Sequence, residues 1–141
     1  MSVYADSSFF VSLYVQDVHS KNADRLLNSG LKPWFTPLHH AEFAHAVGQQ
    51  VFRGQITAAE LRNVHSQLEK DRAAGLWKET ALPDAAFRIC ADLARRHGPR
   101  LGIRTLDSLH VASALLLKAE RFWTFDERQA KLAKAEGLKA A

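Results

Sequence analysis

Short segments that can form strands alternate with stretches of helical spacing along this chain, and this alternation constrains the fold more than any other feature. The strand segments are expected at residues 2–5, 34–35, 76–80 and 122–125. Parallel strands require a crossover between them, usually a helix. The order therefore predicts an α/β fold with a mainly parallel sheet and more helix than strand. The 141 residues contain no linker or repeat, so we expect a single domain over residues 1–141.

Capping residues predict where the helices begin. Thr36 precedes Pro37, and proline at the first helical position loses no hydrogen bond, so a helix is expected from there to about Phe52. Thr57 and Glu60 form a capping box for the next helix. Further helices are expected over 9–14, 21–27, 83–98, 106–119 behind a Thr105 cap, and 126–137, where Asp126 and Gln129 open the helix.

The net charge of +4 weakly favours polyanionic partners. Basic residues are densest at Arg95, Arg96, His97, Arg100 and Arg104. Two interpretations stay open for this basic cluster: a solvated helix end, or a patch that contacts phosphates.

Localisation can also be predicted from the sequence. No stretch reaches the roughly 20 apolar residues that a membrane span needs, and the N-terminus does not resemble a secretory signal. Cys90 is the only cysteine, and it shares a helical stripe with Phe87, Ala91 and Ala94, which predicts a thiol in the core. We therefore expect a protein of the reducing cytoplasm with no membrane partner.

Four carboxylates form the candidate site. Asp6 ends the first strand, Asp126 follows the last, Asp107 opens a helix, and Glu42 lies in the second turn of another. Ligands of open parallel sheets bind beyond the carboxyl ends of the strands, so these acids can converge. Clustered anions need a compensating cation, and oxygen ligands favour Mg²⁺ or Mn²⁺.

A structural role is the alternative for the three aspartates. Each stands at or near a helix start, where aspartate caps free N–H groups and meets the positive end of the helix dipole. Glu42 lies beyond the first turn and has no capping role. On this alternative the chain is a non-catalytic α/β protein that binds an anion or RNA.

Histidines suggest a further alternative. Glu42-x-x-His45 and Asp107-x-x-His110 resemble the ligand pairs of di-iron helical bundles. The short strands break the four-helix pattern that such a site needs, and His110 is expected to be a satisfied, partly buried residue. His39 and His40 are expected at the surface.

Four segments, YADSSFFVSLY, HHAEFAHA, TLDSLHVASALLL and WTFDERQAKLA, resemble in order and spacing the motifs of PIN domains, and most of all those of VapC-type toxins. The resemblance implies a three-layer α/β/α sandwich with a short central parallel sheet. It also implies Mg²⁺- or Mn²⁺-dependent endoribonuclease activity, as the toxin of a toxin–antitoxin pair.

The resemblance also implies roles for single residues. By position in the motifs, the catalytic and metal-binding acids are Asp6, Glu42, Asp107 and Asp126, supported by the hydroxyl residues Ser7, Ser8 and Thr124. A divalent ion held there would polarise a phosphoryl oxygen and activate a water for phosphodiester hydrolysis. The implied partners are an RNA substrate, a cognate antitoxin protein and a second copy of the chain in a homodimer.

Overall fold

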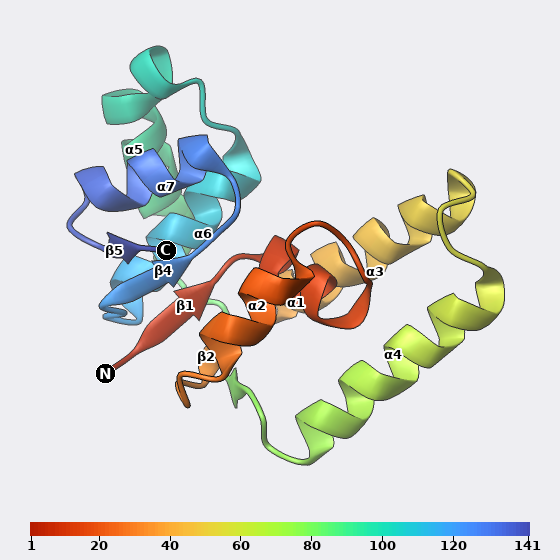
Figure 1. The fold of residues 1–141 in the computed structure, drawn as a ribbon. Helices are drawn as coiled ribbons and strands as arrows, with labels where there is room; N and C mark the ends of the chain where they lie inside the picture. The colour runs from red at the N-terminus through yellow and green to blue at the C-terminus, as the bar shows by residue number, and fades with distance from the viewer. The chain divides into compact units, whose positions relative to one another are not determined.

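The computed structural model describes all 141 residues, which form two compact parts (Figure 1). One part consists of Met1–Asp6 and Ala81–Ala141, and the other of Ser7–Thr80. We call them the first and the second part and describe each by itself. No helix has the length and hydropathy needed to cross a membrane.

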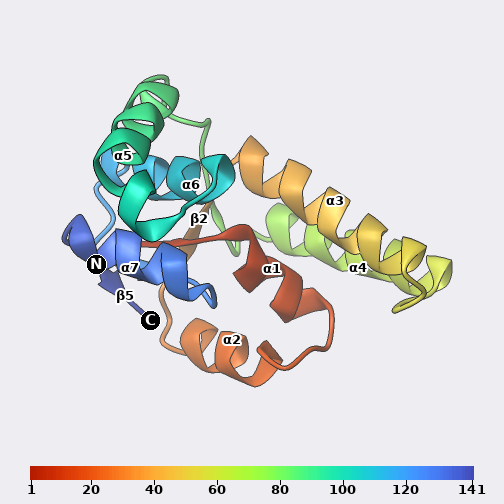
Figure 2. The same cartoon turned by 90° about the horizontal axis from the view of Figure 1, so that it is seen from above.

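Three short strands and three helices make up the first part. Its elements are β1 (Val3–Ala5), α5 (Ala86–Leu101), α6 (Thr105–Leu116), β4 (Arg121–Trp123), α7 (Glu127–Ala135) and β5 (Lys139–Ala140). β4 pairs in parallel with β1 on one side, Tyr4 opposite Phe122, and with β5 on the other. α6 packs against both α5 and α7 (Figure 2). β1 and most of α6 are fully buried, so the core of this part lies between them.

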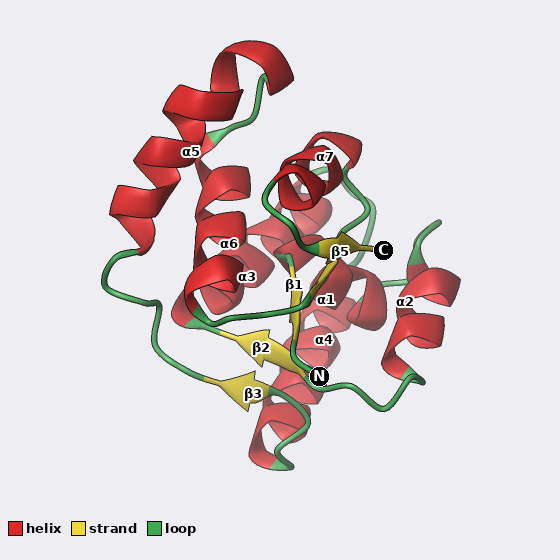
Figure 3. Ribbon diagram, turned by 90° about the vertical axis from the view of Figure 1, so that its left-hand side faces the viewer, coloured by secondary structure: helices red, strands yellow, loops and turns green.

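The second part is mainly helical. Its elements are α1 (Ser7–Tyr14), α2 (Ser20–Leu27), β2 (Pro33–Phe35), α3 (Pro37–Phe52), α4 (Ala58–Ala73) and β3 (Lys78–Glu79). β2 and β3 pair in parallel, with Trp34 opposite Lys78 (Figure 3). α3 and α4 run side by side as an antiparallel hairpin (Figures 1 and 2).

Aromatic rings fill the core of the second part. Phe10 meets Phe35 and Trp77 edge to face, with ring centroids 5.2 and 5.1 Å apart. Such edge-to-face pairs contribute about 0.5–1.5 kcal/mol each beyond the area they bury. The helix that carries Phe10 begins at Ser7, directly after the predicted site residue Asp6.

The predicted element order is confirmed, and several boundaries are corrected. α5 runs through Gly98 and Pro99, because Gly102, at φ +63°, supplies the left-handed helix cap instead. α6 ends at Leu116 and not at Ala119. There Lys118 takes a left-handed conformation, and the N–H of Ala119 donates to the carbonyl of Ala114 at 3.0 Å, as in a Schellman motif. No glycine marks this end in the sequence.

Two further corrections concern elements that carry site residues. Arg104, and not Thr105, is the N-cap of α6. β4 ends at Trp123, so Thr124 and Phe125 lie beyond the strand. The strand β5, which the sequence analysis did not predict, extends the ladder past β4.

Candidate functional site

Asp6 lies at the end of β1 and is held by the residue that follows β4. Its N–H donates to the carbonyl of Trp123 at 3.0 Å, which continues the β1–β4 ladder by one bond. The Oγ1 of Thr124 lies 2.8 Å from Asp6 Oδ2 and donates to it. Asp6 is only 6% exposed. A buried carboxylate needs such a donor, so Thr124 fixes the orientation of this acid.

Asp126 begins α7 beside the same hydroxyl group. Its Oδ1 accepts a hydrogen bond from the N–H of Gln129 at 2.9 Å, so Asp126 caps the helix. Its own N–H donates to Thr124 Oγ1 at 3.0 Å. The Thr124 hydroxyl therefore contacts both the carboxylate of Asp6 and the backbone N–H of Asp126.

Gln129 connects this group to α6. Its Oε1 lies 2.8 Å from Thr124 Oγ1, and its Nε2 donates to the carbonyl of Asp107 at 3.3 Å. The sequence analysis placed Gln129 only at the start of a helix. The sequence feature that could have identified Gln129 is its polar side chain on the same face of α7 as the buried Leu132 and Ala133. We call Asp6, Thr124, Asp126, Gln129 and Asp107 the acid network.

Asp107 is the third residue of α6 and contacts its N-cap. Its Oδ2 accepts from the backbone N–H of Arg104 at 3.4 Å and lies 3.3 Å from Arg104 Nε. The Arg104 side chain is 76% exposed, whereas that of Asp107 is 18% exposed. Asp107 therefore serves as a cap through one carboxylate oxygen, as Asp126 does, and the other oxygen takes no part in these bonds.

Glu42 belongs to the second part, where it meets one of the predicted supporting residues. The Oγ of Ser7 donates to Glu42 Oε1 at 2.7 Å. Ser7 is buried in the first turn of α1, and Glu42 is half-buried on α3. Ser8, its neighbour, is exposed. Ser7 thus orients Glu42, and it directly follows Asp6 in the chain.

The oxygen atoms of the acid network are of the types that bind a hard divalent cation. They are carboxylate, hydroxyl, amide and carbonyl oxygens, which Mg²⁺ and Mn²⁺ prefer. The structure groups no three or more His, Cys, Asp or Glu side chains at the spacing of a formed metal site. Mg²⁺ usually keeps several waters and takes one or two carboxylates. The network therefore fits such an ion as a source of one or two direct ligands.

The histidines serve the core and the helix surface instead. His110 is 2% exposed, and its Nδ1 lies 2.7 Å from the hydroxyl of Tyr4, so it is the satisfied buried histidine that the sequence predicted. The surface prediction for His39 is wrong: it is fully buried, and its Nδ1 accepts from the N–H of Thr36 at the start of α3. His45 is exposed. These roles give no support to the di-iron alternative.

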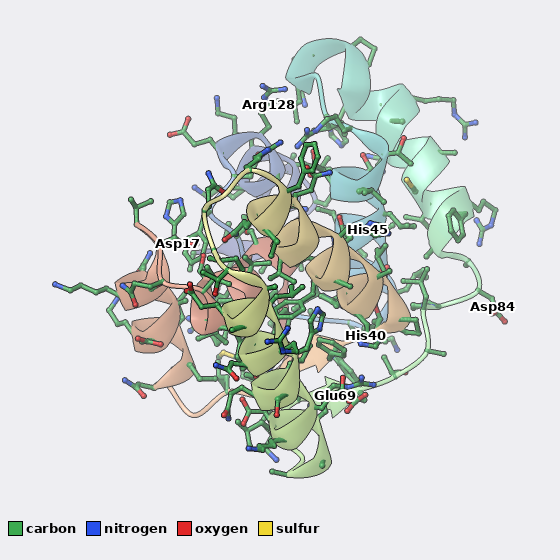
Figure 4. The ribbon with its side chains drawn as sticks, turned by 90° about the vertical axis from the view of Figure 1, so that its right-hand side faces the viewer. Asp17, His40, His45, Glu69, Asp84 and Arg128 are labelled. Carbon is green, nitrogen blue, oxygen red and sulfur yellow. The ribbon has the colours of Figure 1, made fainter.

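Figure 4 shows His40 of α3 beside Glu69 of α4, and their Nε2 and Oε1 atoms lie 3.5 Å apart. His40 is exposed, as the sequence predicted.

Acidic neighbours neutralise much of the basic cluster. Arg96 contacts Asp92 and Glu136, each at 2.9 Å, and His97 Nε2 lies 2.9 Å from Glu136. The hydrogen bond from Arg96, followed by that from His97, lowers the pKa of Glu136. His97 is buried, so this end of α5 has a structural role. Arg104 is the N-cap of α6, which carries Asp107, and the exposed Arg128 (Figure 4) lies on α7, which carries Gln129.

Comparison with known proteins gives one family and several similar structures. The sequence profile of the PIN domain family matches residues 3–135. No curated protein matches the chain.

Three solved structures share the fold at low sequence identity. FitAcB from Neisseria gonorrhoeae has a TM-score of 0.72 at 14% identity, over 98% of this chain and 95% of that one. VapC20 from Mycobacterium tuberculosis, described as a sarcin-ricin loop cleaving toxin, scores 0.70 at 16%, over 97% and 96%. VapBC2 from Rickettsia felis, bound to a DNA fragment from its promoter, scores 0.67 at 15%, over 100% and 98%.

Proposed function

The chain belongs to the PIN domain family, and we propose that it is an Mg²⁺- or Mn²⁺-dependent endoribonuclease, the toxin of a toxin–antitoxin pair. Family membership confirms the predicted fold class, α/β with the three-layer arrangement and short parallel sheet of PIN domains. The proposal extends the family assignment to an activity, a metal and a set of residues.

The acid network is the observation that carries the proposal. It connects Asp6, Asp126 and Asp107 through the buried side chains of Thr124 and Gln129. Helix caps alone would not require Asp6 to be buried with a hydroxyl donor on its carboxylate. Asp6 contacts the buried hydroxyl through its carboxylate, whereas Asp126 and Asp107 join the network through a backbone N–H and a backbone carbonyl. In this proposal the divalent ion binds carboxylate oxygens that these bonds hold in place.

Two of the acids would keep an oxygen for the ion. Asp107 uses Oδ2 for Arg104 and Asp126 uses Oδ1 as a cap, so we assign the second oxygen of each to the metal or its waters. Glu42, oriented by Ser7, is the fourth acid of the proposal through its match to the family motif. A bound ion supplies charge for the phosphoryl oxygen and lowers the pKa of a coordinated water.

The substrate proposal rests on charge and on the family. Arg104 carries an exposed guanidinium beside Asp107, and a guanidinium can hold a phosphodiester through two hydrogen bonds. Among the structures that share the fold, VapC20 is described as cleaving the sarcin-ricin loop. We therefore propose RNA as the substrate of this chain, a cognate antitoxin and a second copy of the chain as its protein partners, and the cytoplasm as its location.

The second candidate function is a non-catalytic α/β protein that binds an anion or RNA. Asp126 and Asp107 do cap α7 and α6, which favours this candidate for these two residues. An Asp→Asn change separates the candidates, because an amide still caps a helix but is a poorer ligand for a divalent ion than a carboxylate.

The test is RNA cleavage by purified wild type and Asp107→Asn, each with Mg²⁺, Mn²⁺ or EDTA. Asp84→Asn is the matched control, because Asp84 is an exposed aspartate outside the acid network (Figure 4). We expect cleavage by wild type and Asp84→Asn that EDTA abolishes, and no cleavage by Asp107→Asn. Equal, metal-independent cleavage by all three proteins would contradict the proposal.

A further inference from the structure

Gln129 is a polar residue in a position that otherwise belongs to the core. It is 1% exposed, and the other buried residues of α7 are Leu132 and Ala133. Burial of an amide without hydrogen bonds is unfavourable. Hydrogen bonds must therefore offset the burial of Gln129, and its hydrogen-bond partners are residues of the acid network.

Each polar group of Gln129 contacts a different residue of the network. Its backbone N–H donates to Asp126 Oδ1, its Oε1 lies 2.8 Å from Thr124 Oγ1, and its Nε2 donates to the Asp107 carbonyl. Thr124 in turn donates to Asp6. One side chain thus connects the segments after β1 and β4 with the first turn of α6.

The hydroxyl of Thr124 has one proton but two acceptors at the same distance. Asp6 Oδ2 and Gln129 Oε1 both lie 2.8 Å from it, while the N–H of Asp126 donates to it. The proton can serve only one acceptor at a time. The amide orientation in the structure lets Nε2 donate to the Asp107 carbonyl and makes Oε1 the second acceptor for the Thr124 proton.

Glutamine is suited to this position because its amide offers both a donor and an acceptor. Methionine has a similar length and offers neither an N–H nor a carbonyl. Asparagine keeps the amide but is one methylene shorter, so it cannot contact Thr124 and Asp107 together.

We propose that Gln129 is a positioning residue of the metal site. Through Thr124 it orients the carboxylate of Asp6, and through the Asp107 carbonyl it holds the turn of α6 that presents the second acid. This inference rests on the proposed function, because it assigns Gln129 a role toward the ion that the aspartates would bind. Partners behind the metal ligands fix ligand orientation, and their loss commonly costs 10–100-fold in metal affinity or activity.

The test measures Mn²⁺ affinity without RNA, by isothermal titration calorimetry, for wild type, Gln129→Met and Gln129→Asn. Lys131→Met is the matched control, since Lys131 is exposed on the same helix. We expect both Gln129 variants to bind Mn²⁺ about 10–100-fold more weakly, and the control to match wild type. RNA binding by the metal-free proteins, measured by fluorescence anisotropy in EDTA, should be the same for all four.

Thermal melting identifies the variants that are folded, and Gln129→Asn retains a buried amide if the methionine variant does not fold. A folded Gln129 variant whose Mn²⁺ affinity is within twofold of wild type would overturn the inference and leave the proposed function intact. Absence of Mn²⁺ binding by wild type would overturn both.

Discussion

Replacement of Thr124 by valine removes the hydroxyl group at the centre of the acid network and keeps the shape of the side chain. Thr124 is 5% exposed. Its Oγ1 donates to Asp6 at 2.8 Å and accepts from the N–H of Asp126 at 3.0 Å. In the valine variant the Asp6 carboxylate and the Asp126 N–H both lose their hydrogen bond to this hydroxyl. Because the site is buried, water replaces these bonds poorly.

The expected cost follows from these two bonds. A hydrogen bond to a charged group contributes about 1.5–3 kcal/mol and one between neutral groups about 0.5–1.5 kcal/mol. Thr124→Val should therefore lower the free energy of unfolding by about 2–4.5 kcal/mol. Thr124→Ser keeps the hydroxyl and loses one methyl group, which costs about 1 kcal/mol.

Urea unfolding at pH 7 in EDTA measures both variants without a contribution from bound metal. The denaturant slope should stay at the wild-type value, so that a change in midpoint reports stability. If Thr124→Val loses no more stability than Thr124→Ser, the hydroxyl does not hold Asp6 as described, and the acid network is not a unit.

Two further predictions concern the first part away from the aspartates. Arg96 lowers the pKa of Glu136. The stabilisation from this pair is therefore complete above the ordinary glutamate pKa of about 4.3 and is lost as the pH falls through the lower, folded value. The urea midpoints of wild type and Glu136→Gln should differ at pH 6 and approach each other as the pH falls below the ordinary glutamate pKa, and a constant difference would refute the linkage. Burial raises the pKa of the Cys90 thiol, so iodoacetamide should label Cys90 slowly in the native protein and rapidly in urea, and equal rates would contradict its burial.

The sequence predicts the element order well, because strand and helix alternate and the helix starts carry capping residues. It misplaces the buried face of α5. The predicted stripe contained Phe87, yet Phe87 is 64% exposed and His97 is buried. Hydropathy cannot anticipate this, since His97 is buried against Glu136, a residue 39 positions away in the chain.

The candidate site is predictable in part. Asp6 follows β1 and Asp126 follows β4. Because these two strands pair in parallel, topology alone predicts that the two acids lie close together. Gln129 could not be found in this way, because its role depends on atoms of Thr124 and Asp107 that only the folded chain brings within reach. Capping and metal binding also share the same residue types, so helix-start patterns do not distinguish them.

The most direct test of the metal site is anomalous diffraction from crystals of the wild-type protein soaked in Mn²⁺. We expect a peak at coordinating distance from an oxygen of Asp6 and from an oxygen of Asp107 or Asp126. Such a peak would establish the acid network as the metal site on which the proposed ribonuclease activity depends. A peak confined to other residues, or none at saturating Mn²⁺, would contradict the account and leave the aspartates as helix caps.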